Sequence, residues 1–145
     1  MPPLSADRAT LHRLGGNHFE EPVAASQMIY TGAIVARNAA GFLVRGATAT
    51  GLVGVGVALE RCDNSAGAAG AVTAKYMRGT ARFANSASGD LITIADIGTR
   101  CFIVDDQTVA RTNGSSTRSP AGIVEDVDAL GVWVRFDEAL TRAAA

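Results

Sequence analysis

The two histidines of the chain, His12 and His18, have the widest chemical use of its side chains, because imidazole acts as a general base and as a metal ligand. They stand six residues apart near the N-terminus, and Glu20 and Glu21 follow closely. A metal site would require this segment to fold back on itself, and a Ser-His-Asp or Cys-His site would have to recruit it. A flexible segment orders ligands poorly, so we interpret these residues as solvated and expect no metal ligand and no catalytic residue.

Two pairs of carboxylates offer acid–base or calcium chemistry. Asp105 is followed directly by Asp106, and one residue separates Asp126 from Asp128. Paired carboxylates can divide the roles of acid and base, and carboxylate oxygens bind calcium. Both pairs fall where turns are expected, and neither matches a calcium-binding loop. Because aspartate commonly caps the backbone amides of turns, turn formation is the favoured interpretation, and a hydrolase built on these residues is not expected.

The cysteines are candidates for a metal or redox motif and two glycines for a dinucleotide-binding motif, and each matches only in part. Cys62 and Cys101 lack the spacing of a metal or redox motif, so we expect reduced, half-buried thiols. The run Gly54-Val55-Gly56 begins like a dinucleotide-binding fingerprint, but Leu59 stands where the third glycine is needed. No cofactor is therefore expected.

The composition describes one domain with a thin core. The chain has 145 residues, of which 48% are apolar and only 6% aromatic, and its net charge is −1. No block of like charge suits nucleic acid or a membrane surface. No secretory signal and no run of about 18 apolar residues is found. We expect a soluble protein, made in a cytoplasm, that binds neither nucleic acid nor membrane directly.

Short β-prone runs separated by turn signals fill residues 22–136. The turn signals recur about every ten residues, with no long amphipathic helix between them, which predicts an all-β domain. We expect a small barrel or sandwich of short antiparallel strands. In the run 52–60, the alternation of a strand places Gly54 and Gly56 on one face, where another backbone can approach. Residues 38–41 and 63–70 are expected to be loops, and residues 91–99 fit either a strand or one helical turn.

Both ends of the chain differ from this β domain. Residues 1–21 mix charged residues with spaced apolar ones, and Gly15-Gly16 breaks any helix there. This segment is predicted to be an extended N-terminal arm, disordered or laid along another surface. Residues 137–145 are predicted to be a short tail with one or two helical turns. The candidate anchors of the arm are Leu4, Leu11, Leu14 and Phe19.

Trp133 is the only tryptophan of the chain. Val132, Val134 and Phe136 share one face of the last predicted strand, so Trp133 points outward if those three face the core. Tryptophan is enriched at interfaces, which makes Trp133 a candidate contact to another subunit or partner. The other interpretation is that it covers the far side of the barrel.

A series of short segments stands in a recognisable order between about residue 20 and residue 136. They are Pro22-Val23-Ala24-Ala25, Ile29-Tyr30-x-Gly32-Ala33-x-Val35, Asn38-Ala39-Ala40-Gly41, Val55-Gly56-Val57-Ala58, Cys62-Asp63-Asn64-Ser65-Ala66-Gly67, Arg78-Gly79, Arg82-Phe83-Ala84-Asn85-Ser86, Ile94-Ala95-Asp96-Ile97-Gly98, Val104-Asp105-Asp106-Gln107-Thr108-Val109-Ala110 and Ala121-Gly122-x-Val124-x-Asp126-Val127-Asp128. Together they resemble small virion proteins encoded beside the major capsid gene in tailed bacteriophages, including Mu-like transposable phages of Gram-negative bacteria.

The resemblance implies a capsid cement, or head-decoration, protein, a family without enzyme activity or cofactor. Such proteins bind the outside of the assembled shell, commonly as trimers, and resist the internal pressure of packaged DNA. Their arm commonly extends over neighbouring capsid subunits. The implied partners are the major capsid protein and copies of this chain in a homotrimer. The implied location is the capsid exterior of a virion, after synthesis in the cytoplasm of a bacterial host.

The alternative function is a virion-surface β module that binds a host receptor or a glycan. Glycan sites favour exposed aromatic side chains, and the candidates in this chain are Trp133, Tyr30 and Tyr76.

Overall fold

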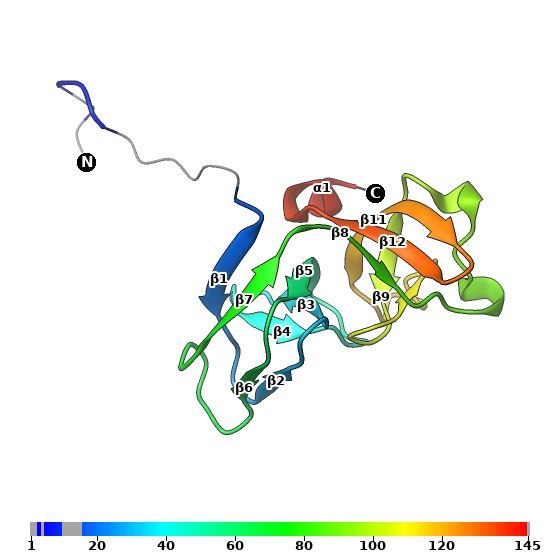
Figure 1. The fold of residues 1–145 in the computed structure, drawn as a ribbon, viewed down its shortest axis with the longest axis horizontal. Coiled ribbons are helices and arrows are strands. Elements are labelled where there is room, and N and C mark those ends of the chain that lie inside the picture. The colour runs from blue at the N-terminus through cyan, green and yellow to red at the C-terminus, as the bar shows by residue number, and fades with distance from the viewer. Residues whose placement is uncertain (1–2, 4, 10–15, 145) are drawn as a thin grey trace.

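The computed structural model describes residue 3, residues 5–9 and residues 16–144 of the chain. Strands make up most of the regular structure in this part, beside two 3-10 turns and one short α-helix (Figure 1). The strands are β1 (His18–Pro22), β2 (Gln27–Ile29), β3 (Ile34–Arg37), β4 (Leu43–Arg45), β5 (Val53–Ala58), β6 (Cys62–Asn64), β7 (Thr73–Met77), β8 (Gly79–Phe83), β9 (Arg100–Ile103), β10 (Val109–Ala110), β11 (Pro120–Asp128) and β12 (Gly131–Phe136). The 3-10 turns are η1 (Ser88–Asp90) and η2 (Ile94–Asp96), and the helix is α1 (Glu138–Ala143). The prediction of an all-β domain is confirmed.

The strands of the described residues form two five-stranded sheets and a two-stranded ribbon. The first sheet has the order β1-β7-β5-β3-β4, the second has the order β10-β9-β11-β12-β8, and the ribbon pairs β2 with β6. Neighbouring strands are antiparallel in all three. Only Arg78 separates β7 from β8, so one extended segment leaves the first sheet and enters the second (Figure 1). The backbone bends at Gly79, whose φ of +116° is open mainly to glycine.

Two hydrophobic clusters lie on opposite faces of β3. Ile34 and Ala36 belong to the cluster that includes Val132 of the second sheet. Val35 belongs to the other cluster, which includes Ile29 of the ribbon. Successive side chains of a strand point to opposite faces, so β3 contributes to both clusters. The first sheet is therefore packed between the ribbon and the second sheet.

The glycines of β5 allow two backbones to approach closely, as the sequence predicts. A Cβ atom on Gly54 would lie 2.0 Å from the carbonyl oxygen of Ala121 in β11. A Cβ atom on Gly56 would lie 2.3 Å from the carbonyl oxygen of Met77 in β7. No real side chain fits at those distances, so the two glycines set the contact between β5 and its neighbours.

Several local predictions agree with the structure. The loop 38–41 closes a hairpin in which the Asn38 amide donates to the Phe42 carbonyl over 2.9 Å. Residues 91–99 adopt the helical alternative, because η2 forms there with the side chains of Thr93 and Asp96 capping its start. The tail forms α1, whose first turn is capped by the Asp137 side chain.

The boundary between arm and β domain lies earlier than the sequence predicts. The sequence predicts an arm up to residue 21, whereas His18–Pro22 forms β1 and pairs along β7 with Phe19 opposite Tyr76. The alternation within β1 turns Phe19 and Glu21 inward, while His18, Glu20 and Pro22 are exposed. Because Glu21 is charged, the sequence favours a solvated segment here. In the fold, Arg37 and Tyr76 bind the Glu21 carboxylate, and this pairing offsets the cost of burying its charge.

The loop predicted at 63–70 also differs in part, because Asp63 and Asn64 complete strand β6. Asn64 is buried, and its side-chain amide donates to the carbonyls of Ala24 (2.8 Å) and Ala68 (3.1 Å). A buried amide must find such partners. Asn64 therefore connects the ribbon to the turn that follows it. The sequence does not predict this role, because asparagine is common in turns and is expected there to be exposed.

Candidate interaction surfaces and binding pocket

A cluster of charged side chains joins the two ends of the described β domain. Arg37 of β3 donates from Nη1 to Glu21 of β1 over 2.5 Å and from Nε to Glu138 of α1 over 3.0 Å. The same Nη1 donates to the carbonyl of Gly41, and the Tyr76 hydroxyl donates to Glu21. We call Glu21, Arg37, Tyr76 and Glu138 the Arg37 cluster. It connects β1, β3, β7 and α1.

The pKa values in the Arg37 cluster follow from these contacts. The hydrogen bond from Arg37 holds the pKa of Glu21 below its ordinary value, although burial opposes it, and the Tyr76 hydroxyl adds to the lowering. Burial and then the bond to the Glu21 anion raise the pKa of Tyr76. The cluster is thus held in one protonation state around neutral pH, with Glu21 ionised and Tyr76 neutral. Its charges are satisfied internally, which fits a structural role.

The predicted arm anchors lie only partly within the structure. Leu4, Leu11 and Leu14 fall outside the described residues. Phe19 is half-buried in β1, where its ring stacks on Tyr76 with centroids 5.6 Å apart. The guanidinium carbon of Arg78 lies 4.2 Å from the centroid of the Phe19 ring. Phe19 therefore packs on the β domain of its own chain.

Trp133 points away from the core, as the alternation predicts, and is half-buried. Val132, Val134 and Phe136 are buried on the opposite face. The indole nitrogen of Trp133 donates to Asp128 over 2.9 Å, and Arg82 of β8 lies 5.5 Å from the centroid of the Trp133 rings. The indole bond is also the largest cause of the lowered pKa of Asp128.

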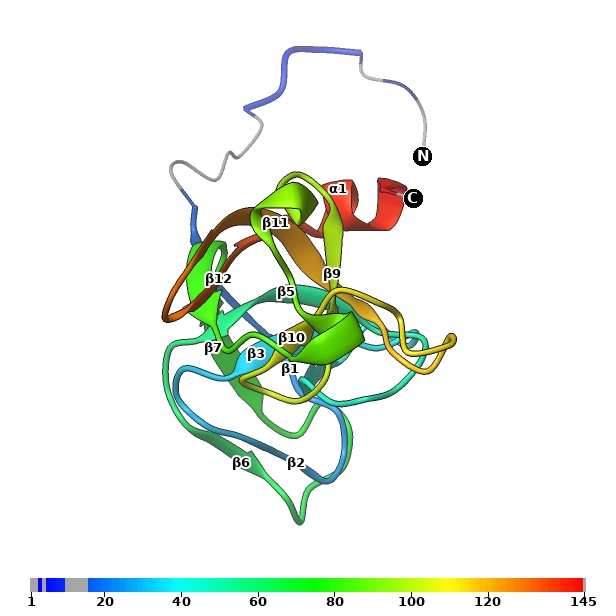
Figure 2. The same ribbon diagram turned by 90° about the vertical axis from the view of Figure 1, so that its right-hand side faces the viewer.

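The two most exposed large apolar side chains among the described residues lie on segments at one end of the second sheet (Figure 1). Ile94 of η2 is 75% exposed, and Leu130, in the turn between β11 and β12, is 74% exposed. Leu91 and Ile97 are exposed beside η2 in sequence. Figure 2 looks onto this end, with residues 85–99 in green to yellow-green and the β11–β12 turn in orange. We call the four exposed residues Leu91, Ile94, Ile97 and Leu130, which these two segments carry, the apolar end.

The backbone under the apolar end is held in place by polar contacts. The Asn85 side chain donates to the Ile92 carbonyl over 2.8 Å and accepts from the Ile92 amide over 2.9 Å. Asp96 pairs with Arg111, with 3.1 Å between Oδ1 and Nε. Ile92 itself is buried in the cluster under the second sheet. The apolar residues are thus presented on a fixed scaffold, which lowers the entropy lost on binding.

Edge strands offer a second kind of contact surface. β1 and β4 end the first sheet, and β10 and β8 end the second. β1 and β8 are the longer edges, with five residues each. The polar backbone groups of an edge strand can pair with a strand of another chain. A Cβ atom on Gly79 at the start of β8 would meet no described atom within 4 Å.

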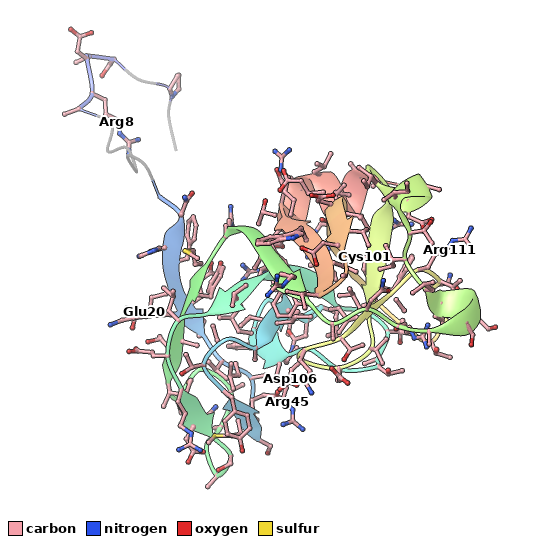
Figure 3. All side chains as sticks on the ribbon, turned by 45° about the vertical axis from the view of Figure 1, so that its right-hand side comes forward. Arg8, Glu20, Arg45, Cys101, Asp106 and Arg111 are labelled. Carbon is pink, nitrogen blue, oxygen red and sulfur yellow. The ribbon has the colours of Figure 1, made fainter. Side chains whose placement is uncertain are left out.

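An open pocket of about 400 Å³ lies where the first sheet meets the turn between β9 and β10. The turn 30–33 forms one wall, and Arg45, Asp106 and Gln107 form the others. Figure 3 shows Arg45 and Asp106 beside each other on one face of the molecule. These residues come from distant parts of the sequence, and only Tyr30 among them is a candidate from the sequence alone, as an aromatic side chain suited to a glycan.

The cysteines are poor nucleophiles in this structure. Both are free and buried, as expected for reduced thiols. Burial raises the pKa of the Cys101 thiol to about 12, and burial together with Asp63 and Glu60 raises the pKa of Cys62. Because the thiolate is the reactive form, both groups are protonated and unreactive at neutral pH.

Of the aspartates considered for acid–base or calcium chemistry, Asp105 and Asp128 cap turns as predicted, whereas Asp126 lies within strand β11 next to a shift in its register with β12. Asp105 accepts from the Gln107 amide over 2.9 Å, and Asp126 accepts from the Val127 amide over 2.8 Å. Asp128 accepts from the Leu130 and Gly131 amides. Among the described residues, no group of three or more His, Cys, Asp or Glu side chains is placed to hold a metal ion.

No family model matches the chain, and neither a curated protein nor a solved structure shows significant similarity to it. Within the described part of the chain, none of the helices has the length and apolar character to span a membrane.

Proposed function

We propose that this chain is a cement protein of a tailed-phage capsid, bound to the outside of the major capsid protein lattice. The observation that carries the proposal is the apolar end, where Ile94 and Leu130 leave about three quarters of their surface open to water. Large apolar side chains with this degree of exposure on a small domain are candidates for a protein–protein contact. The resemblance of the sequence to head-decoration proteins supplies the identity of the partner.

Self-association is part of the proposal. The open edges of β1 and β8 offer backbone groups that a neighbouring copy can pair, and Trp133 lies on β12 next to β8. A homotrimer covers these edges and presents several copies of the apolar end to the capsid. Several linked contacts bind more tightly than one, because the later contacts form at a high effective concentration.

The mechanism is stabilisation by mass action. A protein that binds only the intact lattice stabilises each site by RT ln(1 + [L]/Kd), which is about 2.7 kcal/mol at a concentration one hundred times Kd. The many sites of a shell multiply this effect. The chain requires no chemical reaction for this role, and we expect no enzyme activity.

The proposal is tested on heads of the phage that encodes the chain, prepared with and without it. Decorated heads should keep their DNA at a higher temperature and survive a larger osmotic shock than undecorated heads. Re-addition of the purified protein should restore both properties. If undecorated heads are as resistant as decorated ones, the chain is no cement protein.

The alternative, a module that binds a receptor or glycan, depends on an exposed aromatic side chain. Tyr76 is fully buried, and Trp133 is half-buried with its indole N–H already donated to Asp128. Tyr30 is 46% exposed and lines the pocket described above. The exposure of Tyr30 therefore favours receptor or glycan binding only at that pocket.

A further inference from the structure

The pocket between the two halves of the β domain is assembled by backbone hydrogen bonds. The Ala33 amide donates to the Tyr30 carbonyl over 3.1 Å and closes the turn 30–33, in which Gly32 has a φ of +83°. The Ile34 amide donates to the Asp106 carbonyl over 2.8 Å and holds the opposite wall against β3. The walls are thus set before any ligand arrives, as expected of a preformed binding site.

The charged side chains in the pocket are not paired with each other. Within the described part of the chain, no ion pair or side-chain hydrogen bond involves the Arg45 guanidinium or the Asp106 carboxylate. Arg111 and Arg118, by contrast, do pair with nearby aspartates. Two opposite charges that line one pocket without neutralising each other leave both an acceptor and a donor for a ligand.

We propose that this pocket is a saccharide-binding site. The Asp106 carboxylate accepts hydrogen bonds from sugar hydroxyls, the Arg45 guanidinium donates to hydroxyl oxygens, and the Gln107 amide can do both. Tyr30 provides an aromatic ring with a polar tip, suited to the mixed apolar and polar faces of a sugar ring. The volume of about 400 Å³ falls within the usual range for small-ligand pockets.

Other ligand classes fit this lining less well. A phosphate or carboxylate ligand would meet the Asp106 carboxylate, and a metal ion would meet the Arg45 guanidinium. A purely apolar ligand would leave both charged groups desolvated and unpaired, which is costly. A neutral polyol satisfies donor and acceptor together.

The Tyr30 ring is held from one side by a cation. The guanidinium carbon of Arg61 lies 5.2 Å from the centroid of the ring. Such a contact contributes modestly to stability at an exposed site and favours one orientation of the ring. A ring already held in place costs less entropy when a sugar stacks on it.

The proposal goes beyond the capsid role and does not depend on it. It is tested by titrating glucose, galactose, N-acetylglucosamine and a core oligosaccharide of bacterial lipopolysaccharide into the full ¹⁵N-labelled chain. At least one of these sugars should cause saturable shifts of amide signals confined to residues 30–33, 45–46 and 105–107.

Substitutions then connect the shifts to the pocket. Asp106→Asn, Arg45→Ala and Tyr30→Ala should each weaken binding by about tenfold or more, the effect of losing one good contact. Asp106 holds the wall through its backbone carbonyl, so Asp106→Asn keeps the scaffold. Asp126→Asn and Arg135→Ala change exposed residues of the second sheet and should leave binding unchanged.

Three results would overturn the proposal. The first is the absence of saturable shifts with every sugar. The second is an equal loss of binding in the pocket variants and in the Asp126 and Arg135 controls. The third is saturable binding of a free amino acid such as glycine in place of sugars, which would show that the separated charges hold a zwitterion. A normal spectrum of each variant without ligand confirms that it is folded.

Discussion

Arg37 and Glu138 form an ion pair, with 3.0 Å between Nε and Oε1, that joins the third strand to the C-terminal helix. The side chains of both residues are largely shielded from solvent. Because Arg37 also binds Glu21 in the first strand, a single guanidinium holds both ends of the β domain to its centre. The stability of the fold should therefore depend on this residue more than on any surface charge.

Arg37→Met removes the cation of the Arg37 cluster and leaves two carboxylates close together. We expect the free energy of unfolding to fall by about 2–3 kcal/mol, somewhat less than for a fully buried pair. Urea denaturation followed by circular dichroism measures the change. Lys75→Ala is the matched control, because Lys75 pairs with Glu60 at an exposed site over 3.7 Å and should cost at most about 0.5 kcal/mol. Equal losses in the two variants would contradict a special role for Arg37.

Glu21 should make stability depend on pH in the acid range. Its pKa in the folded state is lowered from an ordinary value of 4.5, so its contribution is fully present above that value. The contribution is lost as the pH falls below 4.5 through the folded pKa. Glu21→Gln should therefore be less stable than the wild type at pH 7, and the difference should shrink toward pH 2. Thermal unfolding across this pH range checks the prediction, and a difference that is constant with pH would refute it.

Gly54→Ala should disrupt the contact between β5 and β11. Its Cβ would lie 2.0 Å from a backbone oxygen that cannot move alone, so we expect a loss of more than about 3 kcal/mol or no folded protein. Gly89→Ala is the control, because a Cβ there meets no described atom within 4 Å. That variant should be neutral or gain up to about 1 kcal/mol. Differential scanning calorimetry of both proteins gives the comparison.

The cysteines should resist thiol reagents in the folded protein. Cys101 is fully buried and its pKa is about 12, so its modification requires extensive unfolding. In native buffer at pH 7.5, labelling with a disulfide reagent such as dithionitrobenzoate should be slow at both sites. In guanidinium chloride both thiols should react at once. Rapid reaction of Cys101 without denaturant would mean that the core around it opens far more readily than its packing implies.

The apolar end should matter for binding to the capsid and little for folding. Leu130→Asp and Ile94→Asp change side chains that are largely in water already, so each should alter the free energy of unfolding by about 0.5 kcal/mol or less. Each should weaken binding to undecorated heads about ten- to one-hundredfold if the residue is central to the contact. Leu140→Asp, on α1 away from this end, should bind normally. Wild-type affinity in both Leu130 and Ile94 variants would remove the apolar end from the proposed interface.

The sequence predicts the strands well where one face is buried. Val132, Val134 and Phe136 alternate with Trp133 and Arg135, and the structure places them as that alternation requires. The hairpin loop 38–41 and the helix at the C-terminus follow equally from local signals. Such features depend on residues close together in the chain, which a single sequence displays directly.

The features that escaped prediction all depend on distant partners. β1 resembled a solvated arm because the residue that compensates Glu21, Arg37, lies in another strand. Likewise, Tyr30, Arg45 and Asp106 each look like ordinary turn or surface residues, and only the fold brings them around one pocket. Tyr30 alone carries a signal in the sequence, as one of the three aromatic candidates for a glycan site.

The segment Thr73–Phe83 passes from one five-stranded sheet into the other with only Arg78 between its two strands. This segment is a covalent connection between the first and the second sheet. A force applied to β1 is transmitted to β12 through the single extended backbone of β7 and β8. Gly79 is the residue at which this backbone can bend. Separation of the two sheets under tension would therefore require breaking at least one hydrogen-bonded ladder, which suits the proposed cement role, in which the protein has to stay folded while the shell beneath it is strained.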